Sequence, residues 1–220
     1  MAIGAYEKSK RYIESHTQKS NPTQIKKEIY PCITISRQTG AGSKPVCEKL
    51  IHIMDDYSEF EGVKWAFFDR NLIERVLEDH NLPKQISEFM HEGKYKHLNS
   101  VVNELLGLKP SEWTLVHKTT ETILQLARMG NVVIVGRGAN VITAKLKNTF
   151  HIRLIASLEK RIEHIKELMD MNDKEALAYI KKEDENRKKY LKSYFHVDTD
   201  DPLLYHMTIN TDLLTHRGTA

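Results

Sequence analysis

Short apolar segments recur along the chain, and each has the length of a buried β-strand. They lie at residues 30–36, 64–69, 131–136, 150–156 and 206–210. In most of these segments apolar side chains occupy both odd and even positions, which is typical of strands covered on both faces. Helical patterns separate the segments from one another. This alternation predicts the α/β fold class, with a parallel sheet that has helices on each side.

Apolar residues between these segments repeat with the spacing of amphipathic helices. The repeating residues are Val46, Leu50 and Ile53 after the first segment, Trp113, Val116, Thr120, Ile123 and Ala127 before the third, and Leu158, Ile162, Ile165 and Leu168 after the fourth. Ser157 stands where it can cap the last of these helices. Asn172, with Glu175 three residues later, forms a capping-box pattern that predicts the start of a further helix.

The order of these elements predicts one main domain with an N-terminal extension. A chain of 220 residues is within the size of a single core. Residues 1–28 precede the first strand and are expected to form an N-terminal arm or helix, and residues 29–220 form the domain. Residues 72–128 are almost wholly helical in pattern and too long for one crossover. We therefore expect a helical region over the sheet there.

Composition and charge exclude several classes of protein. Lys and Arg total 33 against 30 Asp and Glu, so the formal net charge of +3 gives only a mild general attraction for anions. Cys32 and Cys47 fall in an expected strand and an expected helix, which does not indicate a disulfide framework. No apolar run reaches the roughly 18 residues of a membrane span. We expect a cytoplasmic protein that has no membrane partner.

A glycine-rich turn between the first strand and the following helix carries the first chemical signal. Gly40 and Gly42 allow backbone N–H groups to point at an anion, the helix N-terminus adds partial positive charge, and Lys44 adds a full charge. The standard phosphate-loop pattern G-x-x-x-x-G-K-[ST] is not met, because Arg37 stands at its first glycine and Ser43 at its lysine. Taken alone, the segment fits a phosphate-binding loop and an ordinary strand-turn-helix corner equally well.

Four further segments occur in a set order with this turn. The ordered set is SRQTGAG at 36–42, FFDRNLIERV at 67–76, VIVGRGAN at 133–140, EDENRKKYLKSYF at 183–195 and NTD at 210–212. Together they resemble the cytidylate-kinase-like family of P-loop nucleoside-monophosphate kinases over about residues 30–214. The resemblance implies a three-layer P-loop NTPase fold with a five-stranded parallel sheet. It also implies a helical substrate region at about 72–128 and a lid at about 172–200.

The resemblance implies ATP-dependent phosphoryl transfer to a nucleoside monophosphate such as CMP, or to a related small acceptor. Such transfer needs mainly positioning and positive charge around the phosphates. The residues expected to hold the donor phosphates are Arg37, Gly40, Ala41, Gly42, Ser43 and Lys44. The expected catalytic residues are Lys44, Arg137, Asp184 and Arg187, the last two being the D-x-x-R pair of the lid. The expected substrate-binding residues are Asp69, Arg70, Arg137 and Arg161.

Magnesium is expected with ATP, because it bridges phosphate oxygens and needs only one or two protein ligands. Ser43 is the candidate ligand and Asp184 a candidate outer-shell acid. The third strand ends VIVGRG, without the acidic residue that usually assists the ion. The 11 histidines lack the spacing of a zinc site.

Two other functions remain open at this point. The altered loop and the missing acid suggest a nucleotide-binding regulatory or interaction module with lost or weak catalysis. Residues 181–192 are rich in bases, but Glu183, Asp184 and Glu185 lie among them, so nucleic acid is not favoured as a partner. The expected partners are small-molecule nucleotides, and a homodimer is left open.

Overall fold

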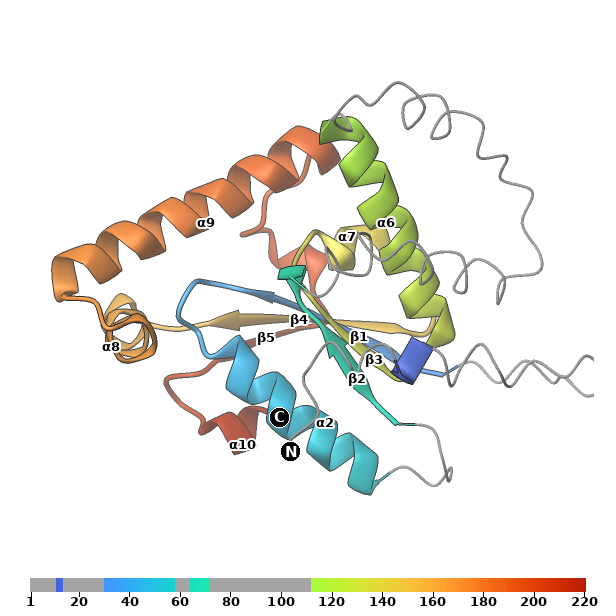
Figure 1. Ribbon diagram of the computed structural model, residues 1–220, viewed down its shortest axis with the longest axis horizontal. Helices are drawn as coiled ribbons and strands as arrows, with labels where there is room; N and C mark the ends of the chain where they lie inside the picture. The colour runs from blue at the N-terminus through green and yellow to red at the C-terminus, as the bar shows by residue number, and fades with distance from the viewer. Residues whose placement is uncertain (1–10, 14–29, 58–63, 72–111) are drawn as a thin grey trace, which may run out of the picture.

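A five-stranded parallel sheet lies at the centre of the protein (Figure 1). The computed structural model describes residues 11–13, 30–57, 64–71 and 112–220. The strands are β1 (Cys32–Arg37), β2 (Ala66–Phe68), β3 (Val132–Val135), β4 (Thr149–Ile155) and β5 (Met207–Asn210), in the spatial order β2-β3-β1-β4-β5. Each predicted strand is confirmed, with ends that differ from the expected ones by at most two residues. The α/β class and the parallel sheet are confirmed as well.

The register makes β1 the central strand. Cys32 pairs with Val132 of β3 on one side and with Thr149 of β4 on the other. Because all the strands are parallel, their carboxyl ends meet along one edge, where ligands bind in open α/β sheets. Arg37 ends β1 at this edge, and Gly136 follows β3 there.

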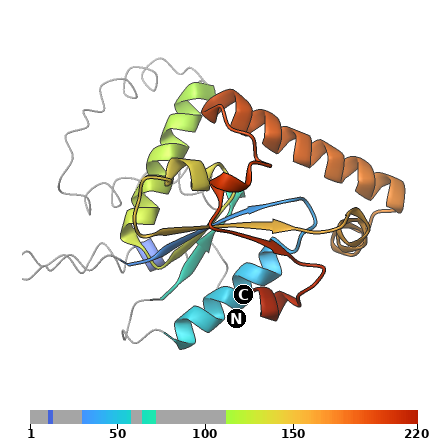
Figure 2. The same cartoon turned by 180° about the vertical axis from the view of Figure 1, so that it is seen from behind.

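Helices cover both faces of the sheet (Figures 1 and 2). On one face lies α2 (Ser43–Asp56), whose Val46, Cys47 and Leu50 pack against residues of β1 and β3. On the other face lie α6 (Glu112–Met129) and α7 (Ala139–Ile142), and Ile123 and Leu126 of α6 are fully buried there. The apolar character of β1 and β3 on both faces is thus explained by a core on each side of the sheet.

Two further helices leave the sheet at its carboxyl edge. The first is α8 (Leu158–Met169), and the second is the 23-residue α9 (Asp173–Phe195), which crosses this edge (Figure 1). A short 3-10 helix (Pro202–Leu204) leads into β5, and α10 (His216–Thr219) packs beside α2. None of the described helices combines the length and apolarity needed to cross a membrane.

The predicted helix starts are confirmed. The Ser157 hydroxyl accepts a hydrogen bond from the Lys160 N–H at 3.3 Å. Asn172 and Glu175 form the expected capping box, with two reciprocal bonds of 3.0 Å. The predicted helix that carries Leu158, Ile162, Ile165 and Leu168 is confirmed as α8, although Leu158 is 37% and Leu168 is 64% exposed. The physical reason is that α8 packs with α9, beyond the edge of the sheet, so only Ile165 is buried.

Several expectations fall partly or wholly outside the described residues. The helical pattern at 113–127 is confirmed by α6, but residues 72–111 of the expected substrate region are not described. Of the expected arm at 1–28, only residues 11–13 are described, and there Tyr12 and Ile13 are buried in the core. The Tyr12 hydroxyl donates to the Gly130 carbonyl. Cys32 and Cys47 are buried free thiols, as the absence of a disulfide framework predicts.

Candidate functional site

The glycine-rich turn connects β1 to α2 under close cover from the C-terminal half of the chain. Gly40 and Gly42 have φ values of +85° and +74°, which favour glycine. A Cβ at Gly40 would lie 2.7 Å from the Arg161 carbonyl oxygen, and one at Gly42 would lie 2.8 Å from His216 Nε2. Gly42 caps α2 without a side-chain hydrogen bond. The turn therefore adopts the left-handed backbone conformation at both of these glycines.

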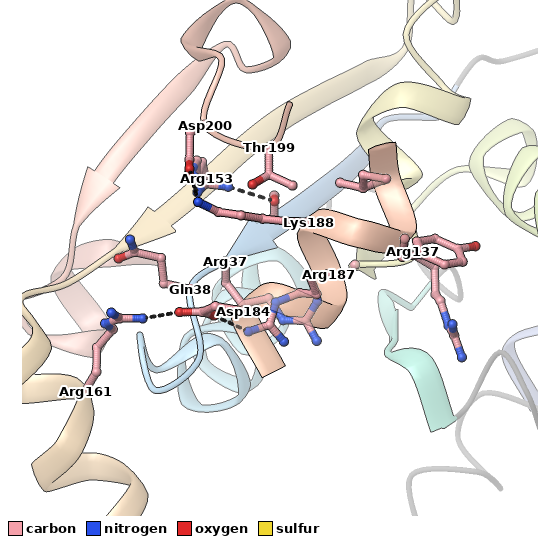
Figure 3. A pocket seen from close by; sticks show the side chains of 14 residues that line it. Arg37, Gln38, Arg137, Arg153, Arg161, Asp184, Arg187, Lys188, Thr199 and Asp200 are labelled. Atoms are coloured by element: carbon pink, nitrogen blue, oxygen red, sulfur yellow. Dashed lines mark hydrogen bonds and ion pairs between the residues drawn. The ribbon is translucent and has the colours of Figure 1, made fainter. Parts of the chain in front are cut away.

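One carboxylate, that of Asp184 on α9, ties this helix to the turn (Figure 3). It accepts hydrogen bonds from the Thr39 N–H at 2.9 Å, the Thr39 hydroxyl at 2.8 Å and Arg161 Nη1 at 2.6 Å. Arg187, one turn further along α9, also donates to it and to the Thr39 hydroxyl. Burial alone would raise the pKa of Asp184, but these hydrogen bonds outweigh it and hold the pKa below its usual value.

A cavity of about 230 Å³ opens between the carboxyl ends of the strands and α9 (Figure 3). The charged residues that line it are Arg37, Arg137, Arg153, Arg161, Arg187, Lys188, Asp184 and Asp200. Six cationic side chains thus face two carboxylates. An excess of guanidinium groups in a partly enclosed cavity is suited to a phosphate-bearing ligand, because the planar fork of Arg matches phosphate oxygens.

Arg37 reaches from the end of β1 toward the end of β3. Its Nη1 lies so near Gly136 that a Cβ there would overlap it. Burial lowers the pKa of Arg37 to about 10, and the charges of Arg187 and Arg137 act in the same direction. Among the described residues, its guanidinium group forms no hydrogen bond or ion pair. Figure 3 shows the Arg37 side chain near those of Arg187 and Asp184.

Arg137 lies in the tight turn after β3. Its φ of +53° falls between those of Gly136 at +82° and Gly138 at +73°, so the turn runs through the left-handed region at three successive residues. The guanidinium carbon of Arg137 is 5.6 Å from the centre of the Tyr190 ring on α9. A Cβ at Gly138 would lie 2.9 Å from Leu191 Cδ2. The turn is therefore held directly against α9.

A second charged cluster joins α9 to the sheet. Arg153 of β4 is only 8% exposed, and its Nη2 lies 2.5 Å from Asp200 Oδ1. Lys188 Nζ of α9 lies 2.7 Å from the other oxygen of Asp200. Arg153 Nη1 also donates to the Tyr205 hydroxyl at 3.2 Å. The loop after α9, the helix itself and β4 are thus connected through one aspartate.

The structure brings five of the twelve predicted site residues to the cavity. Arg37, Arg137, Arg161, Asp184 and Arg187 line the cavity. Lys44 is exposed on the first turn of α2, Arg70 is exposed after β2 and Asp69 is half-buried, and these three are not among the lining residues.

The backbone of Gly40, Ala41, Gly42 and Ser43 forms the turn and the start of α2. In this part of the structure, the Thr211 hydroxyl donates to the Ala41 carbonyl at 3.3 Å, and Asp212 accepts from the Ser157 N–H at 2.8 Å.

Sequence reasoning did not assign roles to Arg153, Lys188, Asp200 and Tyr205. One signal for Arg153 exists, since a charged residue in an apolar strand needs a buried counter-charge. The His164 and His216 rings, 6.1 Å apart, also lie beside Gly42 without having been predicted.

No group of three or more His, Cys, Asp or Glu that could hold a metal ion occurs among the described residues. This is compatible with magnesium, which keeps several of its waters. Ser43 is half-buried at the start of α2 and suits this role. Asp184 is already engaged by Thr39 and two arginines.

The chain is similar to several solved structures. An uncharacterized protein from Eubacterium ventriosum ATCC 27560 is 19% identical and superposes with a TM-score of 0.58, covering 82% of this chain and 87% of that chain. This likeness shows a shared fold. The shikimate kinase of Acinetobacter baumannii, solved with shikimate, is 16% identical with a TM-score of 0.43, over 86% of this chain and 87% of that chain. The shikimate kinase of Bacteroides thetaiotaomicron is 15% identical with a TM-score of 0.40, over 83% and 86%.

A comparison with curated proteins found no match. The cytidylate kinase-like family, in contrast, matches residues 32–213, which include β1 to β5 and all the residues that line the cavity. The chain therefore belongs to the cytidylate kinase-like family, and this membership supports nucleotide-dependent phosphoryl transfer as its general class of activity.

Proposed function

We propose that this protein transfers the γ-phosphoryl group of ATP to the phosphate of a nucleoside monophosphate, with CMP as the first candidate, or to a related small acceptor. The observation that carries the proposal is the cavity at the carboxyl edge of the sheet. Five arginines and one lysine line it, and α9 covers it. A site of this charge favours ligands with several phosphate oxygens.

In the proposed reaction, an oxygen of the acceptor phosphate bonds to the γ-phosphorus of ATP. The bond from that phosphorus to the bridging oxygen breaks, and ADP and a diphosphate are the products. We assign the donor phosphates to the backbone of Gly40 to Ser43 and to Lys44. We assign the acceptor phosphate to Arg137, with Asp69, Arg70 and Arg161 nearby, and the transferring group to Arg187 with Asp184. These side chains would act by positioning and by charge stabilisation.

Magnesium would be held by the Ser43 hydroxyl and by the donor phosphates. When bound, it would neutralise charge on those phosphates. Asp184 would contribute only indirectly, because its carboxylate already accepts hydrogen bonds from Thr39, Arg161 and Arg187.

The test is ADP release with ATP and magnesium across a panel of acceptors that includes CMP, UMP, AMP and GMP. We expect release that depends on one of these acceptors. Arg137→Ala and Arg187→Ala should each slow it at least tenfold, a change of about 1.4 kcal/mol in barrier height. Arg128→Ala, on the exposed side of α6, is the matched control and should leave the rate unchanged. No release with any acceptor, from folded protein, would refute the proposal.

A second candidate is a nucleotide-binding regulatory module with weak or lost catalysis. The observation that favours it is the Thr39 N–H, which donates to Asp184 at 2.9 Å and so is already occupied. The replacement of the loop lysine by Ser43 points the same way. Calorimetry that finds nucleotide binding without turnover would support this candidate. The cytoplasmic location and the homodimer stay predictions.

A further inference from the structure

Arg37 stands at an unusual position in the phosphate-binding turn. The standard motif has a glycine there, which contributes no side chain, and its lysine follows the last glycine. In this chain Ser43 takes the place of that lysine. Lys44 is exposed on α2 and does not line the cavity. The turn therefore has no lysine that lines the cavity. Arg37, at the first position of the motif, places an arginine there instead.

The fold makes room for the Arg37 side chain. Arg37 Nη1 occupies the space that a Cβ would take at Gly136, so a glycine after β3 is required for this side chain to pass. Arg37 lines the cavity beside Arg137 and Arg187. Its guanidinium group therefore lies between the donor turn that follows β1 and the Arg137 turn that follows β3.

The cavity that Arg37 lines carries more cationic than acidic side chains. Arg187 and Arg137 act to lower the pKa of Arg37, whereas Cys47 and Asp69 act to raise it. In the cavity, the Asp184 carboxylate already accepts from Arg161, Arg187 and Thr39. Within the described residues, Arg37 has no hydrogen bond or ion pair of its own. A partly buried guanidinium in this state is stabilised when an anion enters the cavity.

We propose that Arg37 binds a dianionic phosphate group together with Arg187, and that it supplies the cavity with the charge that Ser43 does not. This inference rests on the proposed function and assigns a ligand to one of its residues. The phosphate group is either that of the acceptor or the phosphoryl group that passes to it. Both sources offer the same oxygens to the guanidinium fork. Lys44 keeps its role at the outer donor phosphates.

The test compares Arg37→Met, Arg37→Lys and the control Arg128→Met in calorimetric binding of inorganic phosphate, CMP and a non-hydrolysable ATP analogue. We expect Arg37→Met to weaken phosphate binding at least tenfold, about 1.4 kcal/mol. Arg37→Lys should weaken it severalfold, because a lysine keeps the charge but loses the fork. Arg128→Met should bind as the wild type does. Loss of CMP binding identifies the acceptor as the source, and loss of analogue binding alone identifies the donor.

Unchanged affinity for all three ligands in Arg37→Met would overturn the inference. If Arg37→Met does not fold, Arg37→Lys decides, and wild-type phosphate affinity in that variant overturns it. Binding is measured without turnover, so the result is independent of the proposed activity. Turnover that persists unchanged in Arg37→Met, with unchanged phosphate affinity, would refute the role of Arg37 and leave the kinase proposal standing.

Discussion

Asp184→Asn tests whether one carboxylate holds α9 against the glycine-rich turn. The amide oxygen of Asn can still accept from Thr39, but the charge that Arg161 and Arg187 share is lost. Hydrogen bonds between charged groups contribute about 1.5–3 kcal/mol each, and breaking a partly buried pair leaves its partner uncompensated. The Asp184 side chain is 22% exposed, so solvent screens part of the interaction. We expect a loss of about 2–4 kcal/mol in the free energy of unfolding at pH 7.

The pH dependence of stability distinguishes the loss of the Asp184 charge from a change in packing. The folded-state pKa of Asp184 is lowered from the ordinary value of 3.8. Its contribution to stability is therefore complete above pH 4 and is lost as the pH falls through the folded pKa. Urea unfolding at pH 7 and at pH 3 should show a large difference between wild type and Asp184→Asn at the higher pH and a smaller one at the lower.

The control for this experiment is Glu185→Gln on the same helix. Glu185 pairs with Lys189 at 3.5 Å, and both side chains are mostly exposed. Such pairs contribute about 0–1 kcal/mol, so this variant should unfold nearly as the wild type does. If Asp184→Asn is as stable as Glu185→Gln at pH 7, or if its deficit is the same at both pH values, the assigned role of the carboxylate is wrong.

Three further predictions concern neighbouring parts of the fold. Gly136→Ala should cost about 1–3 kcal/mol in urea unfolding, because its Cβ would overlap Arg37 Nη1 and its φ is +82°; Gly218→Ala, at a surface glycine, is the control. Asp200→Asn should increase hydrogen exchange in the second half of α9, because it weakens the links to Arg153 and Lys188; unchanged exchange there would contradict this. Burial, and then the charge of His206, lower the pKa of His151 to about 4. The His151 ring should therefore show no NMR titration between pH 8 and 5, and the free energy of unfolding should fall as the pH drops from about 6.5 toward 4. An NMR titration midpoint near pH 6.5 would contradict this.

The sheet could be predicted because its cause is local to each segment. Val132 to Val135 are all buried, so a continuous apolar run is what a central parallel strand requires. The caps at Ser157 and Asn172 follow from residues three positions apart. The cationic residues Arg137 and Arg187 were found through the order of the family segments. Their meeting at one cavity is a consequence of the parallel strands, which bring turns distant in sequence to the same edge.

Other features depend on side-chain directions that spacing does not encode. Arg37 was expected to help hold the donor phosphates. Its side chain extends toward Gly136, in the turn after β3. Asp200 pairs with Arg153 across 47 positions of sequence, and nothing in the loop after α9 marks it as a partner. His216 lies against Gly42 because a short C-terminal helix packs on α2. In each case several partners are compatible with the sequence, and only the tertiary packing determines which one the side chain contacts.

Three of the six cations that line the cavity, Arg37, Arg161 and Arg187, differ in the hydrogen bonds that they already form. Arg161 and Arg187 already donate to Asp184, so each must share or break a hydrogen bond to contact an entering phosphate. Arg37 has no such bond to lose among the described residues. Part of the attraction at Arg161 and Arg187 is therefore offset by the loss of an internal contact, whereas the attraction at Arg37 is not. Removal of Arg37 should consequently weaken phosphate binding more than its single charge suggests, and removal of Asp184 should strengthen it.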